Sequence, residues 1–99
     1  MSAVAQDEAV QFDDLPTGAK LRVKTRHHAY VIERLSNGHA RIAGHPQYCP
    51  EPTEVDLRGS SWNGYMPQRH LLAPGMQLEF LHPGIGIVRT SRIEEIERA

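Results

Sequence analysis

Charged and less polar residues alternate strictly along the stretch from Lys20 to Arg26. A period of two puts one face of a strand against a core and the other in water, so this alternation predicts a half-buried strand. Residues 30–35 are rich in aromatic and β-branched side chains and predict a second strand. Asn37-Gly38 supplies two residues that tolerate positive φ, as a tight hairpin turn requires, and residues 39–43 are expected to return as a third strand.

Three more strands are expected after residues 44–52, whose prolines cannot hold a regular ladder. These strands cover residues 53–58, 77–81 and 85–90, with residues 59–67 expected to form a glycine-flanked loop. Ser91 and Glu94 match a helix capping box, which predicts a short helical turn over residues 92–97 with Ile93 and Ile96 on one side.

These elements predict an all-β fold: a small five- or six-stranded barrel or rolled antiparallel sheet of SH3-like or OB-like size, with a short C-terminal helical turn. Residues 18–99 are expected to form this single domain, preceded by a flexible acidic leader at residues 1–17. The apolar residues of the leader, which could attach it to the domain, are Val10, Phe12 and Leu15.

The charges are unevenly distributed although the formal net charge is only −1. Acidic residues crowd both ends of the chain, whereas residues 19–93 hold ten Lys and Arg against five Asp and Glu, together with all six histidines. The folded body is therefore expected to be more basic than the whole-chain charge indicates.

Two features are candidates for a binding surface. The first is the face of the first predicted strand, where Lys20, Arg22, Lys24 and Arg26 recur at about the spacing of nucleic-acid phosphates. The alternative is that these side chains form an ordinary solvated face. The second is the 59–66 loop, in which exposed Trp62 and Tyr65 would stack on bases or anchor a protein partner. The alternative is that Trp62 folds inward into the core.

No catalytic or cofactor motif is found. The chain has no P-loop, no dinucleotide-binding G-x-G-x-x-G, no H-E-x-x-H and no G-x-S-x-G elbow, so we expect a non-enzymatic protein without cofactors. His45 and Cys49 offer two soft metal ligands four residues apart, but a structural zinc site needs four, so no metal is predicted. If several histidines gather near a basic face, anion binding should strengthen as the pH falls through about 6.5.

The sequence predicts a cytoplasmic protein. No apolar run approaches the length of a membrane span, and residues 1–10 lack the features of a signal peptide. A single cysteine, Cys49, fits a reducing compartment.

Three short motifs resemble those of a set of short bacterial proteins that have no assigned activity. They are G-x-K-L-x-V-x-T at residues 18–25, the Gly-Ser turn at residues 59–61, and TS-x-I-x-x-I at residues 90–96. The resemblance implies a compact β-barrel and supplies no catalytic residues.

The leading functional hypothesis is a non-enzymatic binding module that meets a protein partner, or a second copy of itself, through residues 62–66 or an open sheet edge. The second is a nucleic-acid-binding barrel that uses the cationic strand face. A small hydrolase or a metal protein is a distant third.

Overall fold

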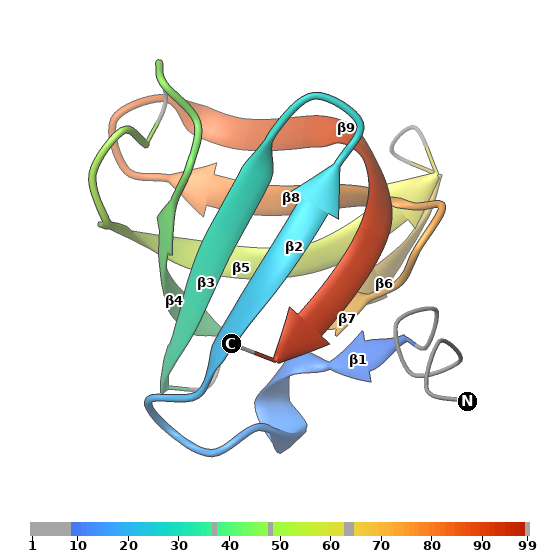
Figure 1. Cartoon of the computed structure of the whole chain (residues 1–99), viewed down its shortest axis with the longest axis horizontal. Helices are drawn as coiled ribbons and strands as arrows, with labels where there is room; N and C mark the ends of the chain where they lie inside the picture. Colours follow the sequence, from blue (N-terminus) through green and yellow to red (C-terminus); the bar gives the residue numbers. More distant parts are fainter. Residues whose placement is uncertain (1–8, 37, 48, 63–64, 99) are drawn as a thin grey trace.

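The computed structural model describes residues 9–36, 38–47, 49–62 and 65–98, with the backbone alone for residues 65–68. The chain is all-β, as the alternation predicts (Figure 1). The elements in chain order are β1 (Val10–Gln11), the 3-10 turn η1 (Phe12–Asp14), β2 (Lys20–Thr25), β3 (Ala29–Ser36), β4 (His39–Ala43), β5 (Thr53–Trp62), β6 (Tyr65–Arg69), β7 (Leu71–Leu72), β8 (Gln77–His82) and β9 (Gly86–Arg98).

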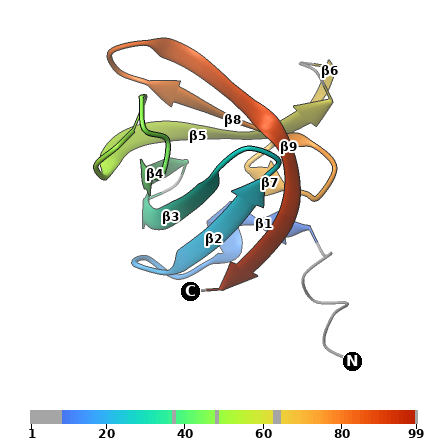
Figure 2. The same cartoon turned by 45° about the horizontal axis from the view of Figure 1, so that its top comes forward.

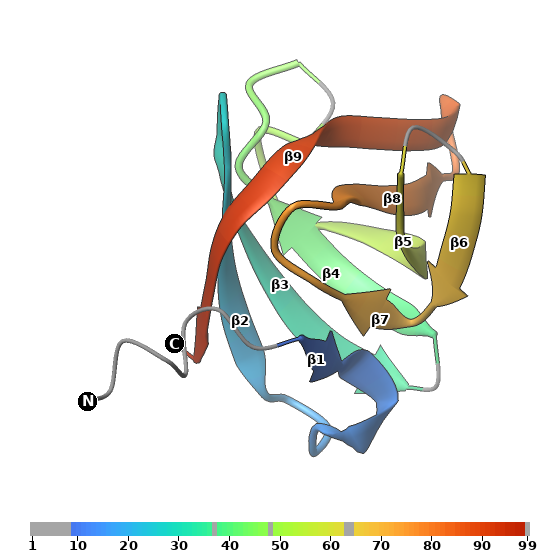
Figure 3. The ribbon, with the colours of Figure 1, turned by 90° about the vertical axis from the view of Figure 1, so that its right-hand side faces the viewer.

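Six of these strands close into a ring (Figures 2 and 3). Each of β2, β3, β4, β5, β8 and β9 pairs antiparallel with the next, and β9 pairs with β2 to complete the circuit. Strand β6 extends the sheet beside β5, and β1 and β7 form a separate two-stranded sheet. The prediction of an all-β fold built as a five- or six-stranded barrel or rolled antiparallel sheet is therefore confirmed, with six strands in the ring.

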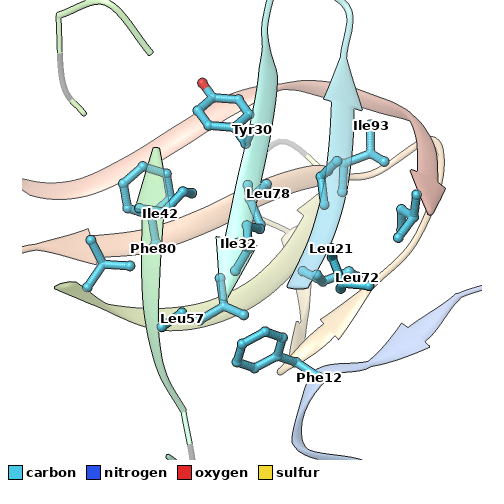
Figure 4. Close-up of a cluster of buried hydrophobic side chains, with 14 of the residues drawn as sticks. Phe12, Leu21, Tyr30, Ile32, Ile42, Leu57, Leu72, Leu78, Phe80 and Ile93 are labelled. Carbon is cyan, nitrogen blue, oxygen red and sulfur yellow. The ribbon is translucent and has the colours of Figure 1, made fainter. Parts of the chain in front are cut away.

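The interior of the ring is filled by aliphatic and aromatic side chains contributed by every strand of the ring (Figure 4). Strand β2 shows the alternation most clearly, because its residues are exposed and buried in strict turn. The β3–β4 hairpin forms as predicted, and Gly38 adopts a φ of 74°. Asn37, the other residue of the predicted turn, lies outside the described residues.

Strand β5 is longer than predicted, and the expected loop over residues 59–67 is wrong for most of its length. The strand continues to Trp62, and β6 begins at Tyr65. A bulge between Leu57 and Gly59 interrupts the register, and Gly59 adopts a φ of 122° there. The polar residues Ser60 and Ser61 suggested a loop, but both are buried in the strand.

The predicted C-terminal helical turn is also wrong, because residues 86–98 form one continuous strand. Register shifts occur against both β8 and β2, so extra residues enter β9 on each side. These irregularities turn Val88, Thr90, Ile93 and Ile96 all inward, although the last three are spaced by three residues. The three-residue spacing of Ile93 and Ile96, which is typical of a helix, therefore arises here from bulges in a strand.

Part of the predicted leader is packed on the domain. Phe12 is fully buried, Val10 and Leu15 pack against the same core, and Val10 pairs with Leu72 across the β1–β7 sheet. The backbone N–H of Phe12 also donates to the carbonyl oxygen of His70 at 2.8 Å. Residues 1–8 lie outside the described residues.

Candidate functional site

The cationic residues predicted to line the first strand all lie on its outer surface. Lys20, Arg22 and Lys24 are exposed on β2, and Arg26 is exposed immediately after it. Their alternation with Leu21, Val23 and Thr25, which are buried, follows the predicted pattern.

Acidic residues of the neighbouring strands face three of these four cations. The continuation of β9 as a strand, in place of a helix, lays two of the three acids directly alongside β2. The Arg22 Nη1 atom lies 3.1 Å from Glu97 Oε1 in an exposed ion pair. The outer face around β2 therefore carries charges of both signs. The cross-strand pairs are Lys20–Glu33, Arg22–Glu97 and Lys24–Glu95.

Trp62 is neither a core residue nor a free stacking platform. Its side chain is 44% exposed. The guanidinium carbon of Arg92 lies 5.5 Å from the centroid of the indole ring, in a cation–π contact, and Arg92 Nη1 also donates to the carbonyl oxygen of Gly75. Tyr65 pairs with Trp62 through the backbone, and its side chain lies outside the described part of the chain.

A groove of about 530 Å³ lies on the outer surface of β5, β6, β8 and β9. Three arginines from three different strands line it: Arg58 from β5, Arg69 from β6 and Arg89 from β9. Their closeness follows from the pairing of the strands, because Gly59 is opposite both Arg69 and Glu79, and Glu79 is in turn opposite Arg89.

Glu79 lies at the base of this arginine groove and is 8% exposed, although it points to the outer side of the sheet. Its Oε2 atom accepts hydrogen bonds from Ser61 Oγ at 2.5 Å and from Arg89 Nε at 2.8 Å. Burial acts to raise the pKa of Glu79, but these two bonds and the charges of Arg89 and Arg58 outweigh it, so the pKa lies below its ordinary value. The carboxylate is therefore charged at neutral pH and holds Arg89 in place.

The groove carries a surplus of positive charge. Against its three arginines stand two acids, Glu79 and Asp56, and Glu79 is already bonded to Arg89. Among the residues that the structure describes, Arg58 and Arg69 make no ion pair with an acid. Ile87, which is 52% exposed, adds an apolar wall. Guanidinium groups bind carboxylates and phosphates through paired N–H donors, so the groove can accept an anionic group beside an aliphatic one.

His45 and Cys49 are brought together through their backbones. The Cys49 N–H donates to the His45 carbonyl oxygen at 3.0 Å. Cys49 is fully buried, and burial raises the pKa of its thiol, which disfavours the thiolate that a metal requires. Within the described ranges, no group of three or more histidine, cysteine or acidic side chains is arranged to hold a metal ion.

Sequence reasoning missed the arginine groove. Arg58 and Arg89 stand at outward positions of predicted strands, and Glu79 stands outward between two core residues, so their faces could be read from the alternation. Their proximity follows only from the strand order. The polar Ser61 gave no signal, because it lay in a stretch interpreted as a loop.

No model of a known protein family, no curated protein and no solved structure matches the chain. The arginine groove is therefore interpreted from its own geometry. In the described part of the chain, no helix has both the length and the apolar character needed to cross a membrane.

Proposed function

We propose that this chain is a non-enzymatic binding module of the cytoplasm, and that its arginine groove receives acidic side chains of a protein partner. The observation that carries this proposal is the convergence of Arg58, Arg69 and Arg89 around one groove, with Arg89 held by a buried carboxylate. A cytoplasmic setting is supported by the free, buried thiol of Cys49.

The composition of the groove favours a protein segment over nucleic acid. Its exposed apolar contribution comes from the aliphatic Ile87, and no aromatic ring on which a base could stack is among the described residues that line it. Arginine is enriched at protein–protein interfaces relative to the rest of the surface. The mixed charges along β2 also weaken the hypothesis that this strand tracks phosphates.

The position of β6 favours the groove over strand addition as the mode of contact. Among the described residues, strand β6 is the outermost strand of its sheet and pairs with β5 alone, so its other edge carries no strand of this part of the chain. Pro67 lies within that strand and has no backbone N–H to donate to an added strand. An edge of this kind resists pairing, so side-chain recognition in the groove is the better-supported route.

The experiment uses a fluorescent peptide in which glutamate alternates with leucine, and a matched peptide with glutamine in place of glutamate. Binding is followed by fluorescence anisotropy at about 50 mM and about 200 mM salt, with a labelled oligothymidylate as the nucleic-acid probe. The test variant is Arg58→Gln with Arg69→Gln. The control is Lys20→Gln with Lys24→Gln, which removes the same charge from β2.

We expect the groove variant to bind the glutamate peptide at least about tenfold more weakly, which corresponds to about 1.4 kcal/mol. The β2 variant should stay close to the wild-type affinity, and the glutamine peptide should bind neither protein. Equal losses in both variants would indicate unspecific attraction and contradict the proposal. Tight binding of the oligothymidylate, weakened by the β2 variant alone, would support the nucleic-acid hypothesis instead.

A second copy of this chain is the other protein partner that the sequence suggests. Analytical ultracentrifugation of the wild-type protein and of the Arg58→Gln, Arg69→Gln variant measures the oligomeric state. It thereby distinguishes a different protein partner from a second copy of this chain. A dimer that is lost when Arg58 and Arg69 are replaced would identify the partner as another copy.

A further inference from the structure

A second hollow, of about 190 Å³, lies where the first half of β9 passes the turn between β2 and β3. Three histidines line it: His27 and His28 from that turn, and His45 from the segment between β4 and β5. Arg89 and Ser91 of β9 and Tyr30 of β3 also line it. This histidine hollow thus gathers side chains from four separate parts of the chain.

The imidazole rings of His28 and His45 lie close together, with their centroids 4.3 Å apart. The ring of Tyr30 is 6.3 Å from that of His28 and 6.5 Å from that of His45. Burial, and then the charge of His28, lower the pKa of His45, because two imidazolium ions at this distance repel each other. A negative charge placed beside both rings, at the mouth of the hollow, would offset that repulsion.

The charged groups that face the histidine hollow are of one sign. The turn supplies His27 and His28, the segment after β4 supplies His45, and β9 supplies Arg89; the uncharged Tyr30 is the contribution of β3. No aspartate or glutamate is among the described residues that line it, in contrast to the arginine groove. Protonation of the histidines therefore adds positive charge to a hollow that no described acidic residue lines.

Arg89 lines both hollows, and its Nε atom is committed to Glu79. Holding this residue in place lowers the entropic cost of ordering the part of β9 that lines the histidine hollow. The volume is several times the roughly 30 Å³ of one water molecule, so it accommodates one small polyatomic ion with a few waters.

We propose that the histidine hollow is a site for a tetrahedral oxyanion of the phosphate class, which binds when the imidazoles of His28 and His45 are protonated. This site is separate from the contact of the arginine groove with a protein partner and does not depend on it. Affinity rises as the pH falls into the range in which histidine side chains take a proton.

Sulfate is the primary probe, because its charge stays constant across this pH range while that of phosphate changes. Calorimetric titration of the full chain at pH 5.0 and pH 8.0, at equal ionic strength, measures the affinity. The test variant is His28→Gln with His45→Gln. The control is His39→Gln, an exposed histidine on β4 that does not line the hollow.

For the wild-type chain and for the His39 control we expect sulfate to bind at least about tenfold more tightly at pH 5.0 than at pH 8.0. The double variant should lose this dependence on pH. The same dependence in the double variant, or no binding by the wild-type chain at pH 5.0, would overturn the proposal. The Arg58→Gln, Arg69→Gln variant should keep its sulfate binding, which separates this site from the arginine groove.

Proton NMR of the wild-type chain gives a second measurement that does not depend on a variant folding. Bound sulfate should raise the pH midpoints of the His28 and His45 ring signals and leave that of His39 unchanged. Equal shifts in all three signals would contradict a local site. Titration with inorganic phosphate and with O-phosphoserine then tells whether the preferred ligand is the free ion or an esterified phosphate.

Discussion

At the residue scale, Glu79 is an acidic side chain on the outer face of a sheet that is nevertheless almost completely buried. It is buried because side chains from adjoining strands gather over it, and its carboxylate is bonded to Ser61 and Arg89. The bond to Arg89 matters for both hollows, because this arginine lines each of them.

Replacing Glu79 with glutamine removes a charged acceptor from two hydrogen bonds, and we expect it to lower the free energy of unfolding at pH 7 by about 1–3 kcal/mol. The pKa of Glu79 is lowered in the folded chain, so its stabilising effect is present above the ordinary pKa of 4.5 and disappears as the pH falls through the lower folded value. Urea unfolding at pH 7 and pH 3 should therefore show a larger difference between variant and wild type at pH 7 than at pH 3.

The matched control is Glu54→Gln, since the Glu54 side chain is 74% exposed and lies 3.9 Å from Arg41. An exposed pair of this kind contributes little, so the control should change stability by less than about 0.5 kcal/mol at either pH. A Glu79→Gln effect of the same size at both pH values would mean that packing, and not charge, accounts for it.

At the element scale, β1 and η1 are held to the domain by more than the burial of Phe12. Asp13 Oδ1 accepts from the Gly38 N–H at 3.1 Å, and Asp13 Oδ2 lies 2.5 Å from His70 Nδ1. His70 itself adopts a φ of 58°, an uncommon value for a residue other than glycine. Together these contacts join the start of the described chain to the β3–β4 turn and to the segment before β7.

Substitution of Phe12 with alanine tests whether this segment belongs to the core. A fully buried phenylalanine that is truncated to alanine costs about 3–5 kcal/mol, and we expect that loss in urea unfolding. Gln11→Ala is the control, since the Gln11 side chain is exposed and donates a long hydrogen bond of 3.4 Å to the Arg69 carbonyl oxygen, and it should cost less than about 0.5 kcal/mol. A loss below about 1 kcal/mol for Phe12→Ala would show that the segment is dispensable.

Most strand positions could be predicted from the alternation of polar and apolar residues, because one face of each strand meets the core. The errors lie where the two-residue period breaks. Bulges in β9 gave Ile93 and Ile96 a helical spacing, and the buried hydroxyl groups of Ser60 and Ser61 had the polarity of a loop. The two-residue alternation by itself does not reveal an inserted residue in a strand. It also does not reveal a buried polar group whose hydrogen-bond partner is distant in sequence.

At the scale of the whole molecule, the ring closes through the pairing of β2 with the second half of β9. Buried Ile93 and Ile96 supply the inner face of that half, and the exposed Arg22–Glu97 pair supplies part of its outer face. Apolar burial is expected to outweigh the exposed ion pair, because solvent screens the latter.

Two variants of neighbouring residues measure this balance. Ile96→Ala should lower the free energy of unfolding by about 2–5 kcal/mol, whereas Glu97→Gln should change it by less than about 1 kcal/mol. Urea unfolding of both proteins in the same buffer gives the comparison. A larger loss from Glu97→Gln than from Ile96→Ala would show that charge pairing dominates closure.

The candidate site was far less predictable than the fold. The alternation of polar and apolar residues places Arg58 and Arg89 on the outer faces of their strands. It does not predict that β5 and β9 both pair with β8. The same holds for His28 and His45, which lie in different connections and meet only because the barrel brings those connections to one place. Sites assembled from several strands depend on strand order, and local patterns do not encode that order.

The pairing of β2 with β9 also bears on how fast the chain folds. The Arg22–Glu97 contact joins residues 75 positions apart. Bringing β2 and β9 together therefore costs the conformational entropy of closing a long loop before the contacts between the two strands stabilise it. Contacts this remote give a high contact order, and domains of that kind refold in milliseconds to seconds, more slowly than small helical proteins. Until this pairing forms, β2 keeps an open edge available to other chains, so slow refolding and a tendency to aggregate during it have the same structural origin.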